Sequence, residues 1–360
     1  MPDSTPTAFY ASRPTFKVGG ERQAALGETL LMSLLVEETS AGMRRCEAHF
    51  TNWGSKGAGV GFLLFDRQTL DFGKELSIEM GPPGSATEVF AGRITALEAH
   101  FPPQRPPELI VLAEDRLQDF RMERRTRSFE QATDAEVFRQ IASQHGLGAD
   151  VDVDGPTYAV LTQINQSDLA FLRERAAAAD AELWVEGRTL RAQARGRRDG
   201  GAVELTYGQS LIEFSVVADL ADQRTSVRVS GWDASGKESI EEEAEESAVS
   251  AELDGRRGGG SVLREALGER KERVVSDVPL SQDEARALAE ARYRERARRF
   301  VRGRGTSDGK PSLRVGTRLD LKGVGPLFEG KYYVTLARHT FDLRHGYRTA
   351  FECERPGVGR

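Results

Sequence analysis

The chain has 360 residues, 39% of them hydrophobic, and its 50 basic and 56 acidic residues leave a formal net charge of −6. This length suits two to four globular domains, and the mixed charge provides no basic face for nucleic acid. The longest apolar runs have the length of strands and fall short of the ~20 residues that a membrane helix needs, so we expect neither a nucleic-acid partner nor a membrane span.

The N-terminus, MPDSTPTAFYASRPTF, lacks the basic start and the apolar core of a secretory signal. We therefore expect the chain to be made and folded in the cytoplasm. Residues 1–15 are polar and interrupted by prolines, and we predict an arm that orders only against a neighbour. Cys46 and Cys353 fall in predicted strands, and we interpret both as buried thiols because a reducing cytoplasm disfavours a disulfide.

Short alternating strands fill residues 15–113, separated by turns rich in Gly, Pro and Ser. So many short strands in about a hundred residues are typical of a β barrel or sandwich. Prolines in the turns Gly81–Gly84 and Pro102–Pro107 exclude central-strand pairing there. Residues 1–113 are therefore predicted to form a first barrel with an N-terminal arm.

The hydrophobic period changes over residues 114–200, where we predict a small α/β domain. Thr133 and Glu136 form a capping box ahead of a first helix. Ser167 is predicted to cap a second helix, which is followed by a hairpin that turns at residues 186–187. The expected apolar faces are Val137, Phe138, Ile141 and Ala142 in the first helix, and Leu169, Leu172 and Ala176 with Phe171 beside them in the second.

Strands resume over residues 201–234 and again over 310–360, and these two segments are predicted to form a second barrel. The segment between them, 235–309, is predicted to be an insertion with an acidic, glycine-rich loop. We expect part of it to be mobile. Ser281 and Glu284 form a capping box that opens a helix over residues 281–302.

Two pairs of similar segments indicate an internal duplication. Leu31–Trp53 and Leu211–Trp232 share an apolar strand, an arginine and a closing tryptophan, and the arginine and tryptophan are offset by 179 residues (224 − 45; 232 − 53). Val89–Phe101 and Leu327–Tyr347 share a Phe-x-Gly-basic opening that is offset by 238 residues (328 − 90). The second copy therefore holds about 59 extra residues (238 − 179), which lie between positions 232 and 316.

Three motifs carry a resemblance: the helix start Asn-x-Ser-Asp-Leu-x-Phe-Leu at Asn165–Leu172, the hairpin Leu183–Leu190, and the ending Phe-x-Gly-x-Tyr…His…Gly-Tyr-x-Thr-x-Phe at Phe328–Phe351. With the helix and linker over 281–311, they resemble the late control D family of baseplate hub proteins from contractile phage tails. The hub module of this family is shared with the VgrG spike proteins of type VI secretion and of related injection particles. The resemblance extends over nearly the whole chain.

This resemblance implies a structural role in a phage tail or injection particle. In the family, two duplicated barrels let a homotrimer present six similar modules and join a sixfold tail tube to a trimeric spike. VgrG-type chains continue into further spike domains, whereas this sequence ends at Arg360, so we expect a separate spike protein. The implied partners are two more copies of the chain, the tail tube protein, the spike and other baseplate proteins, with no specific nucleic acid and no stable membrane insertion.

Two other functions were weighed, a tail-associated peptidoglycan hydrolase and a carbohydrate-binding module. Glu174 and Asp180 could form a catalytic pair, but Glu174 lies in a charged helix where a surface position is expected. The sequence contains no lysozyme-like or cysteine–histidine peptidase constellation. Trp53, Trp184 and Trp232 could form a sugar platform, but each lies in or at the end of an alternating strand, where a core aromatic is expected.

Three further patterns have an ordinary structural interpretation. His339 and His345 are six residues apart on one face of a predicted strand, but a third metal ligand is missing, so we expect hydrogen-bonded or partly exposed residues. Gly255–Gly260 follows neither a strand nor a lysine-serine motif, which favours a flexible loop over a phosphate cradle. The run Glu238–Glu246 is interpreted as a solvated face or a partner-contacting loop.

The sequence thus predicts an α+β, mainly β protein. It is expected to consist of two tube-type β barrels related by duplication, an α/β domain between them and a partly helical insertion in the second barrel. We assign no catalytic residue, cofactor or metal, and the residues that contact partners are not identified.

Overall fold

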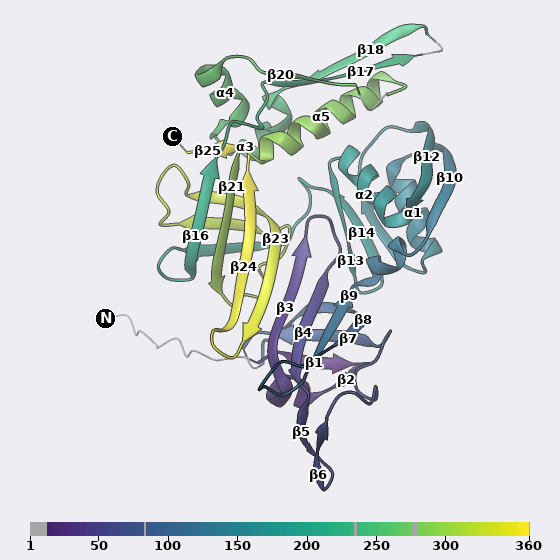
Figure 1. The fold of residues 1–360 in the computed structure, drawn as a ribbon. Coiled ribbons are helices and arrows are strands. Elements are labelled where there is room, and N and C mark those ends of the chain that lie inside the picture. The colour runs from purple at the N-terminus through teal and green to yellow at the C-terminus, as the bar shows by residue number, and fades with distance from the viewer. Residues whose placement is uncertain (1–12, 83, 234–235, 276–278, 360) are drawn as a thin grey trace.

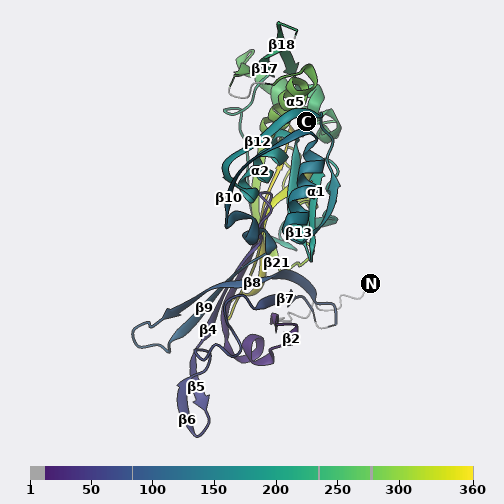
Figure 2. The same ribbon diagram turned by 90° about the vertical axis from the view of Figure 1, so that its right-hand side faces the viewer.

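The computed structural model describes residues 13–82, 84–233, 236–275 and 279–359 (Figures 1 and 2). The fold is mainly β, as predicted. Within the described ranges, the longest helices are too short or too polar to cross a membrane. Most of the predicted N-terminal arm, residues 1–12, lies outside the described residues, and the first strand already begins at Thr15.

A thirteen-stranded sheet forms the centre of the molecule. Its strands pair in the order β16 (Leu211–Ala218), β21 (Val301–Asp308), β24 (Gly346–Arg355), β23 (Gly330–Asp342), β3 (Leu31–Thr39), β4 (Arg45–Thr51), β9 (Glu108–Glu114), β8 (Thr87–His100), β7 (Glu75–Met80), β1 (Thr15–Val18) and β2 (Glu21–Arg22). β22 (Arg318–Lys322) also pairs with β23, and β15 (Ala202–Thr206) pairs with β22.

The two halves of this sheet have the same strand order. The first half reads β3-β4-β9-β8-β7-β1, and the second reads β16-β21-β24-β23-β22-β15. They join where β23 pairs antiparallel with β3, from Leu336 opposite Thr39 to Asp342 opposite Ser33. The backbone hydrogen bonds therefore continue from one half into the other (Figure 1).

Each half has its own apolar core. In the first half, Phe16, Phe50 and Phe90 are almost fully buried, and in the second half Phe351 and Tyr332 are. Alternation along the strands puts these side chains on one face of the sheet. The two cysteines are free and buried in these cores, which confirms the predicted buried thiols.

The helices of the α/β region agree with the prediction. α1 (Asp134–Gln144) begins with the full capping box of Thr133 and Glu136, and α2 (Asp168–Ala178) is capped by Ser167, whose hydroxyl accepts from the Ala170 N–H. The predicted apolar faces of both helices are buried. The strands are β10 (Arg124–Ala132), β11 (Gly148–Asp152), β12 (Tyr158–Ser167), β13 (Ala181–Glu186) and β14 (Thr189–Ala194), and the turn of the last hairpin falls at 187–188, one residue later than expected.

A second small sheet lies in the upper part of Figure 1 and is covered on one face by α5 (Gln282–Arg298). It pairs β17 (Ser226–Asp233) with β18 (Glu238–Ala244) and β20 (Lys271–Val274). Residues 226–233 are predicted to lie in the second barrel, but the position beside β16 is taken by β21. The helix predicted to reach residue 302 ends at Arg298, and β21 forms in the segment predicted to be the helix end and the linker. Gly303 and Gly305 suggest a helix stop and a linker, but they make room for neighbouring rings, because added Cβ atoms would lie 2.6 Å from Phe214 and 2.7 Å from Phe351.

The glycine-rich segment 255–260 forms regular secondary structure from Arg257 onward, which corrects the prediction of a loop. It forms β19 (Arg257–Gly258), which pairs with β25 (Gly357–Val358), and the start of α4 (Gly259–Leu267). Gly258, Gly259 and Gly260 are needed for close packing. A Cβ atom would lie 2.5 Å from the Glu246 carboxylate at Gly258 and 2.5 Å from the Tyr293 hydroxyl at Gly260.

The remaining elements are short. α3 (Ser250–Leu253) follows the 3-10 turn Glu246–Val249, a second 3-10 turn covers Arg116–Arg121, and a π-helical turn covers Leu26–Leu30. The hairpin of β5 (Trp53–Lys56) and β6 (Gly59–Phe62) projects from the lower end of the molecule in both ribbon views.

Candidate functional site

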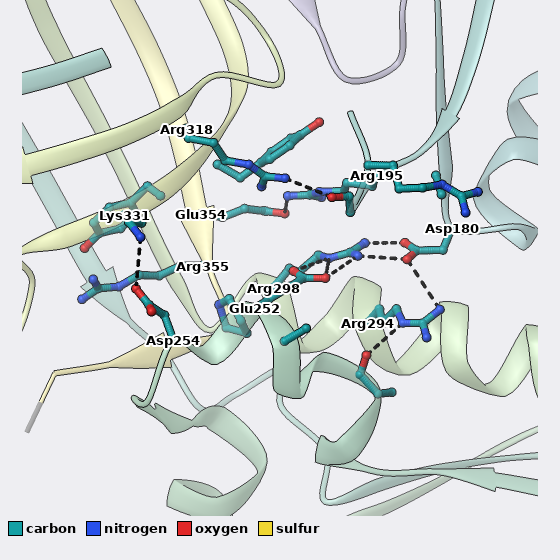
Figure 3. Close-up of a pocket in the computed structure, with 18 of the residues that line it drawn as sticks. Asp180, Arg195, Glu252, Asp254, Arg294, Arg298, Arg318, Lys331, Glu354 and Arg355 are labelled. Atoms are coloured by element: carbon teal, nitrogen blue, oxygen red, sulfur yellow. Dashed lines mark hydrogen bonds and ion pairs between the residues drawn. The ribbon is translucent and has the colours of Figure 1, made fainter. Parts of the chain in front are cut away.

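A cleft of about 510 Å³ lies where the α/β region, the α5 insertion and the second half of the large sheet meet (Figure 3). Eight basic and four acidic side chains line it: Arg195, Arg197, Arg256, Arg294, Arg298, Arg318, Lys331 and Arg355, with Asp180, Glu252, Asp254 and Glu354. The cleft therefore has an excess of four positive charges (8 − 4) in a chain whose net charge is −6.

Arg298, at the end of α5, forms the centre of the first ion-pair group in this cleft. Its side chain is 3% exposed, and its guanidinium donates to both oxygens of Asp180 and to both oxygens of Glu252, with an Nη2 to Oε1 distance of 2.7 Å. Burial opposes the Glu252 charge, but the hydrogen bonds from Arg298 hold the pKa of this carboxyl below its ordinary value. Because Asp180 follows α2, Arg298 ties α5 to the α/β region.

Glu182 on β13 forms the centre of a second group. One of its oxygens accepts from Arg198 at 2.8 Å and from the Tyr333 hydroxyl at 2.5 Å. Arg198 also donates to Glu38 of β3 at 3.3 Å. Beside this group, Arg195 pairs with Glu354 at 2.6 Å. These contacts connect the α/β region to both halves of the large sheet.

The four carboxylates that line the cleft each have a basic partner within 4 Å. A general acid needs a raised pKa, and Glu252 has a lowered one. The arrangement instead fits a clamp between domains, because a buried ion pair holds its two elements in a single geometry.

The structure does not pair Glu174 with Asp180, the two residues considered as a catalytic pair. Glu174 is exposed on α2, as expected, and accepts from the Gln166 side-chain amide at 2.8 Å. Asp180 instead belongs to the Arg298 group and also lies 3.7 Å from Arg294. Across the described ranges no group of three or more His, Cys, Asp or Glu is arranged to hold a metal ion.

His339 and His345 do not share a strand, which corrects the prediction. β23 ends at Asp342, and His345 lies in the following turn, where its Nδ1 is 3.0 Å from Asp342. His339 is buried, with its Nδ1 2.8 Å from the Tyr347 hydroxyl. Burial lowers the pKa of His339 to about 4, an effect that the Arg44 charge reinforces and the Glu38 charge opposes.

The variant His339→Gln is expected to remove part of the acid sensitivity of the fold. Between pH 6.5 and 4, His339 is protonated in the unfolded chain but neutral in the folded chain. The free energy of unfolding therefore falls as the pH falls. This difference is worth about 3 kcal/mol in total. Urea unfolding at pH 7 and pH 4 should show a smaller loss for His339→Gln than for the parent. His345→Gln is the exposed control, and equal losses in all three proteins would contradict the assignment.

The expectation that all three tryptophans are core aromatics is correct for Trp184 but wrong for the other two. Trp184 is buried, with the Arg198 guanidinium 4.0 Å from its ring, as expected of a core aromatic. Trp53 and Trp232 are 43% and 52% exposed. Both lie outside the large sheet: Trp53 begins β5 and meets the Phe62 ring edge-on at 5.1 Å, and Trp232 lies near the end of β17. The three side chains come from separate parts of the fold and do not form one platform.

Most of the acidic run Glu238–Glu246 forms the strand β18, on which Glu238 and Glu241 are exposed, so the predicted solvated face is confirmed and the alternative of a loop is wrong. In β18, Glu241 and Glu243 pair with Arg228 of the neighbouring β17, at 2.5 and 2.7 Å. Glu246 accepts from the backbone N–H and the hydroxyl of Ser261 at the start of α4. The helix terminus that follows the glycines is therefore capped by a carboxylate of the chain itself.

The open face of the large sheet carries a charge ladder that sequence analysis missed. One cross-strand row reads Arg338, Glu37, Arg45, Glu114, Arg93 and Glu75, on β23, β3, β4, β9, β8 and β7 in turn. Opposite charges directly across strands stabilise the pairing. Burial opposes the Glu37 charge, but hydrogen bonds from Arg338 and Arg45 keep the pKa of its carboxyl below the ordinary value. Only the strand register reveals this row.

Comparison with solved structures places this fold among tail proteins. Over 96% of this chain and 98% of the other, it superposes on a 43 kDa tail protein of a Shewanella oneidensis prophage, with a TM-score of 0.69 and 11% identity. A tail protein from Neisseria meningitidis gives 0.65 and 13% over 97% and 98% of the two chains. An E. coli component of the type VI secretion system gives 0.54 and 11% over 96% and 79%.

The chain thus has a phage-tail fold that is shared with type VI secretion, which confirms the predicted resemblance to baseplate hubs at the level of the fold. The chain belongs to the family described as the Alg8 N-terminal domain, whose sequence model matches residues 44–342. No curated protein matches it.

Proposed function

We propose that the chain is a structural, non-enzymatic baseplate hub of a contractile phage tail or injection particle. In this proposal it is a homotrimer that adapts the sixfold tail tube to a trimeric spike on a separate polypeptide. The observation that carries the proposal is the shared strand order of the two halves of the large sheet. Three chains with two similar halves would supply six similar positions around one axis.

Details of the strand pairing support a duplication. β3 and β16 each carry a register shift against their neighbour at the same place, between Leu31 and Ser33 in one and between Leu211 and Glu213 in the other. β8 and β23 likewise each carry a shift against β9 and β24. Bulges re-aim side chains and are retained as designed features, so two matched bulges favour a common origin of the two tube-type modules.

The open face of the sheet supports the expected lumen. The charge ladder lies on it, and Glu47 and Glu98 lie on the same face of β4 and β8, two strand positions or more from the ladder. Leu35 and Leu112 lie on either side of Glu47 on this face and are partly exposed, so the lining would be charged but not polar throughout. Its carboxylates would disfavour contact with phosphates. The α/β region and the insertion, held by the Arg298 and Glu182 groups, would surround the ring as rigid parts.

The molar mass in solution tests the proposal. Light scattering on the purified chain, alone and mixed with its tail tube and spike proteins, is expected to give the mass of three copies, at the latest once the spike is added. A chain that remains monomeric with both partners would overturn the hub assignment. In that case, a saturable affinity of the monomer for sugars or hydrolysis of cell-wall material would favour the carbohydrate-binding or hydrolase alternatives.

A further inference from the structure

We infer that β16 of one copy pairs antiparallel with the free edge of β8 in the next copy, in the register that β3 and β23 use within one chain. The inference rests on the proposed trimer and deepens it, because it names the residues through which the copies meet. The partner is thus a second copy of this chain.

Both strands have a free edge. β16 pairs with β21 on one side, and along its other side the described residues make only a bridge between Tyr207 and Leu211 at its first residue. β8 pairs with β9 from Arg93 to His100, but its other side pairs with β7 only as far as Arg93. Ile94 still accepts from the Gly73 N–H at 2.8 Å and donates to the Lys74 carbonyl at 3.0 Å, so the described edge of β8 is open from Thr95 onward. Open strand edges are templates for pairing with another chain unless something covers them.

Inside the chain, the corresponding edges are paired with each other. β3 occupies in the first half the place that β16 occupies in the second, and β23 corresponds to β8 in the same way. β23 uses its N-terminal residues for β22 and the stretch from Leu336 to Asp342 for β3. One copy therefore already contains an example of the joint that we assign between copies.

The matched bulges fix the register. Leu31 corresponds to Leu211, an offset of 180 (211 − 31), and Ile94 corresponds to Val334, an offset of 240 (334 − 94). These values correct the offsets of 179 and 238 predicted from the sequence, because Trp232 belongs to β17 outside the large sheet and the extra residues lie between β16 and β21. Within the chain, Thr340 lies opposite Leu35. Subtracting 240 from 340 gives His100 on β8, and adding 180 to 35 gives Ser215 on β16. We therefore expect His100 of one copy to lie opposite Ser215 of the next. By the same offsets, the pair Phe341 and Leu34 becomes Phe101 opposite Phe214.

Exposure of apolar side chains supports this assignment. Phe341 is 3% exposed and belongs to the core of the first half, whereas its counterpart Phe101 is 61% exposed. Phe214 packs against the core of the second half, so Phe101 would complete that core in the next copy. On β16, Ile212 and Val217 are also about half exposed, at 48% and 49%. By the same offsets Pro102, the counterpart of Asp342, would lie opposite Glu213 at the end of the joint, where it has no N–H to donate, so we expect the pairing to end at Phe101.

The chemistry favours a second copy over an unrelated protein. The two edges are different surfaces of one chain, as a head-to-tail ring requires, and the ring can close when the rotation between copies is one third of a turn. Each copy would then offer β16 to one neighbour and β8 to the other. All six joints around the ring would have the same geometry, three within chains and three between them.

The double variant His100→Cys with Ser215→Cys tests the register in the full-length chain. Side chains directly opposite across antiparallel strands have Cβ atoms about 4.5–5.5 Å apart, close enough for a disulfide, whereas diagonal neighbours lie about 7–8 Å apart. We expect oxidation in the presence of the spike to give a species of three chains on a non-reducing gel. The slipped pair His100→Cys with Val217→Cys is expected to give at least tenfold less of this cross-linked species. The parent chain is expected to give none of it, because its two thiols are buried.

The experiments distinguish failure of the β16–β8 pairing from failure of the hub proposal. Three copies by light scattering without preferential cross-linking of the His100–Ser215 pair would overturn this pairing and leave the hub proposal standing. Monomers with both partners present would overturn the hub proposal itself. As a second test, Phe101→Asp should weaken trimer formation at least tenfold, while Val60→Asp, at a site that is 70% exposed on the β5–β6 hairpin, should leave it unchanged. Equal effects of the two variants would also contradict the pairing.

Discussion

Replacing Arg298 by alanine is expected to lower the free energy of unfolding by about 3–5 kcal/mol. The guanidinium is the shared partner of Asp180 and Glu252, and its side chain is only 3% exposed. Its removal leaves two carboxylates facing each other across a narrow cleft, without the donor that compensates for their lost hydration. The measurement is the midpoint of urea unfolding followed by circular dichroism at pH 7.

Arg299 provides the matched control, because it is the next residue at the same end of α5. Its guanidinium pairs with Glu295 at 2.9 Å, and both side chains are about half exposed. Such a pair, one turn apart on a helix surface, contributes only about 0.3–0.5 kcal/mol. Arg299→Ala should therefore leave the midpoint nearly unchanged. If Arg298→Ala and Arg299→Ala lower the free energy of unfolding by similar amounts, removing any arginine from this end of α5 destabilises the protein equally. The clamp interpretation would then be wrong.

The features that sequence analysis predicted correctly are those that depend on neighbours in the chain. The Thr133 capping box, the Ser167 cap and the buried faces of α1 and α2 follow from side chains three or four residues apart. The burial of Cys46 and Cys353 follows from alternation within a strand. Each of these signals is complete within about a dozen residues, so no knowledge of the tertiary fold was needed.

Features that depend on pairing between distant strands could not be predicted in the same way. Residues 226–233 are predicted to lie in the second barrel and residues 301–308 to be a helix end and a linker, and only the structure shows that the second segment is the strand beside β16. The charge ladder requires the register of six strands before its charges fall into one row. Gly258 and Gly260 looked like loop residues because glycine gives no sign of the Glu246 and Tyr293 side chains that fill the space beside it.

The ion-pair groups show the same limit for the candidate site. Asp180 was singled out as one half of a catalytic pair, but its partner in the fold is Arg298, 118 residues away. Glu182 meets Tyr333 over 151 residues. Charged residues are common throughout this chain, and no local spacing marks the few that become buried and paired. Burial is the signal that separates them, and burial is a property of the assembled domains.

Glu182→Ala is expected to cost about 3–5 kcal/mol, the range for breaking a buried ion pair from one side. Arg198, whose side chain is 4% exposed, would lose its 2.8 Å contact, and the Tyr333 hydroxyl would lose its acceptor. Because Glu182 joins the α/β region to the second half of the sheet, and Arg198 extends the link to Glu38 in the first, the loss should shift the urea midpoint of the whole chain.

Two further variants make this prediction specific. Tyr333→Phe keeps the ring, 4.2 Å from the Arg195 guanidinium, and removes only the hydroxyl, so we expect a loss of about 1.5–3 kcal/mol, as for a hydrogen bond to a charged group. Glu186→Ala, on the same strand as Glu182, removes a half-exposed pair with Arg191 and should cost less than about 1 kcal/mol. The expected order is Glu182→Ala, then Tyr333→Phe, then Glu186→Ala. If Glu186→Ala caused the largest loss of stability, the Glu182 contacts would not be what holds β13 in place. The domains would then be held together by their apolar contacts alone.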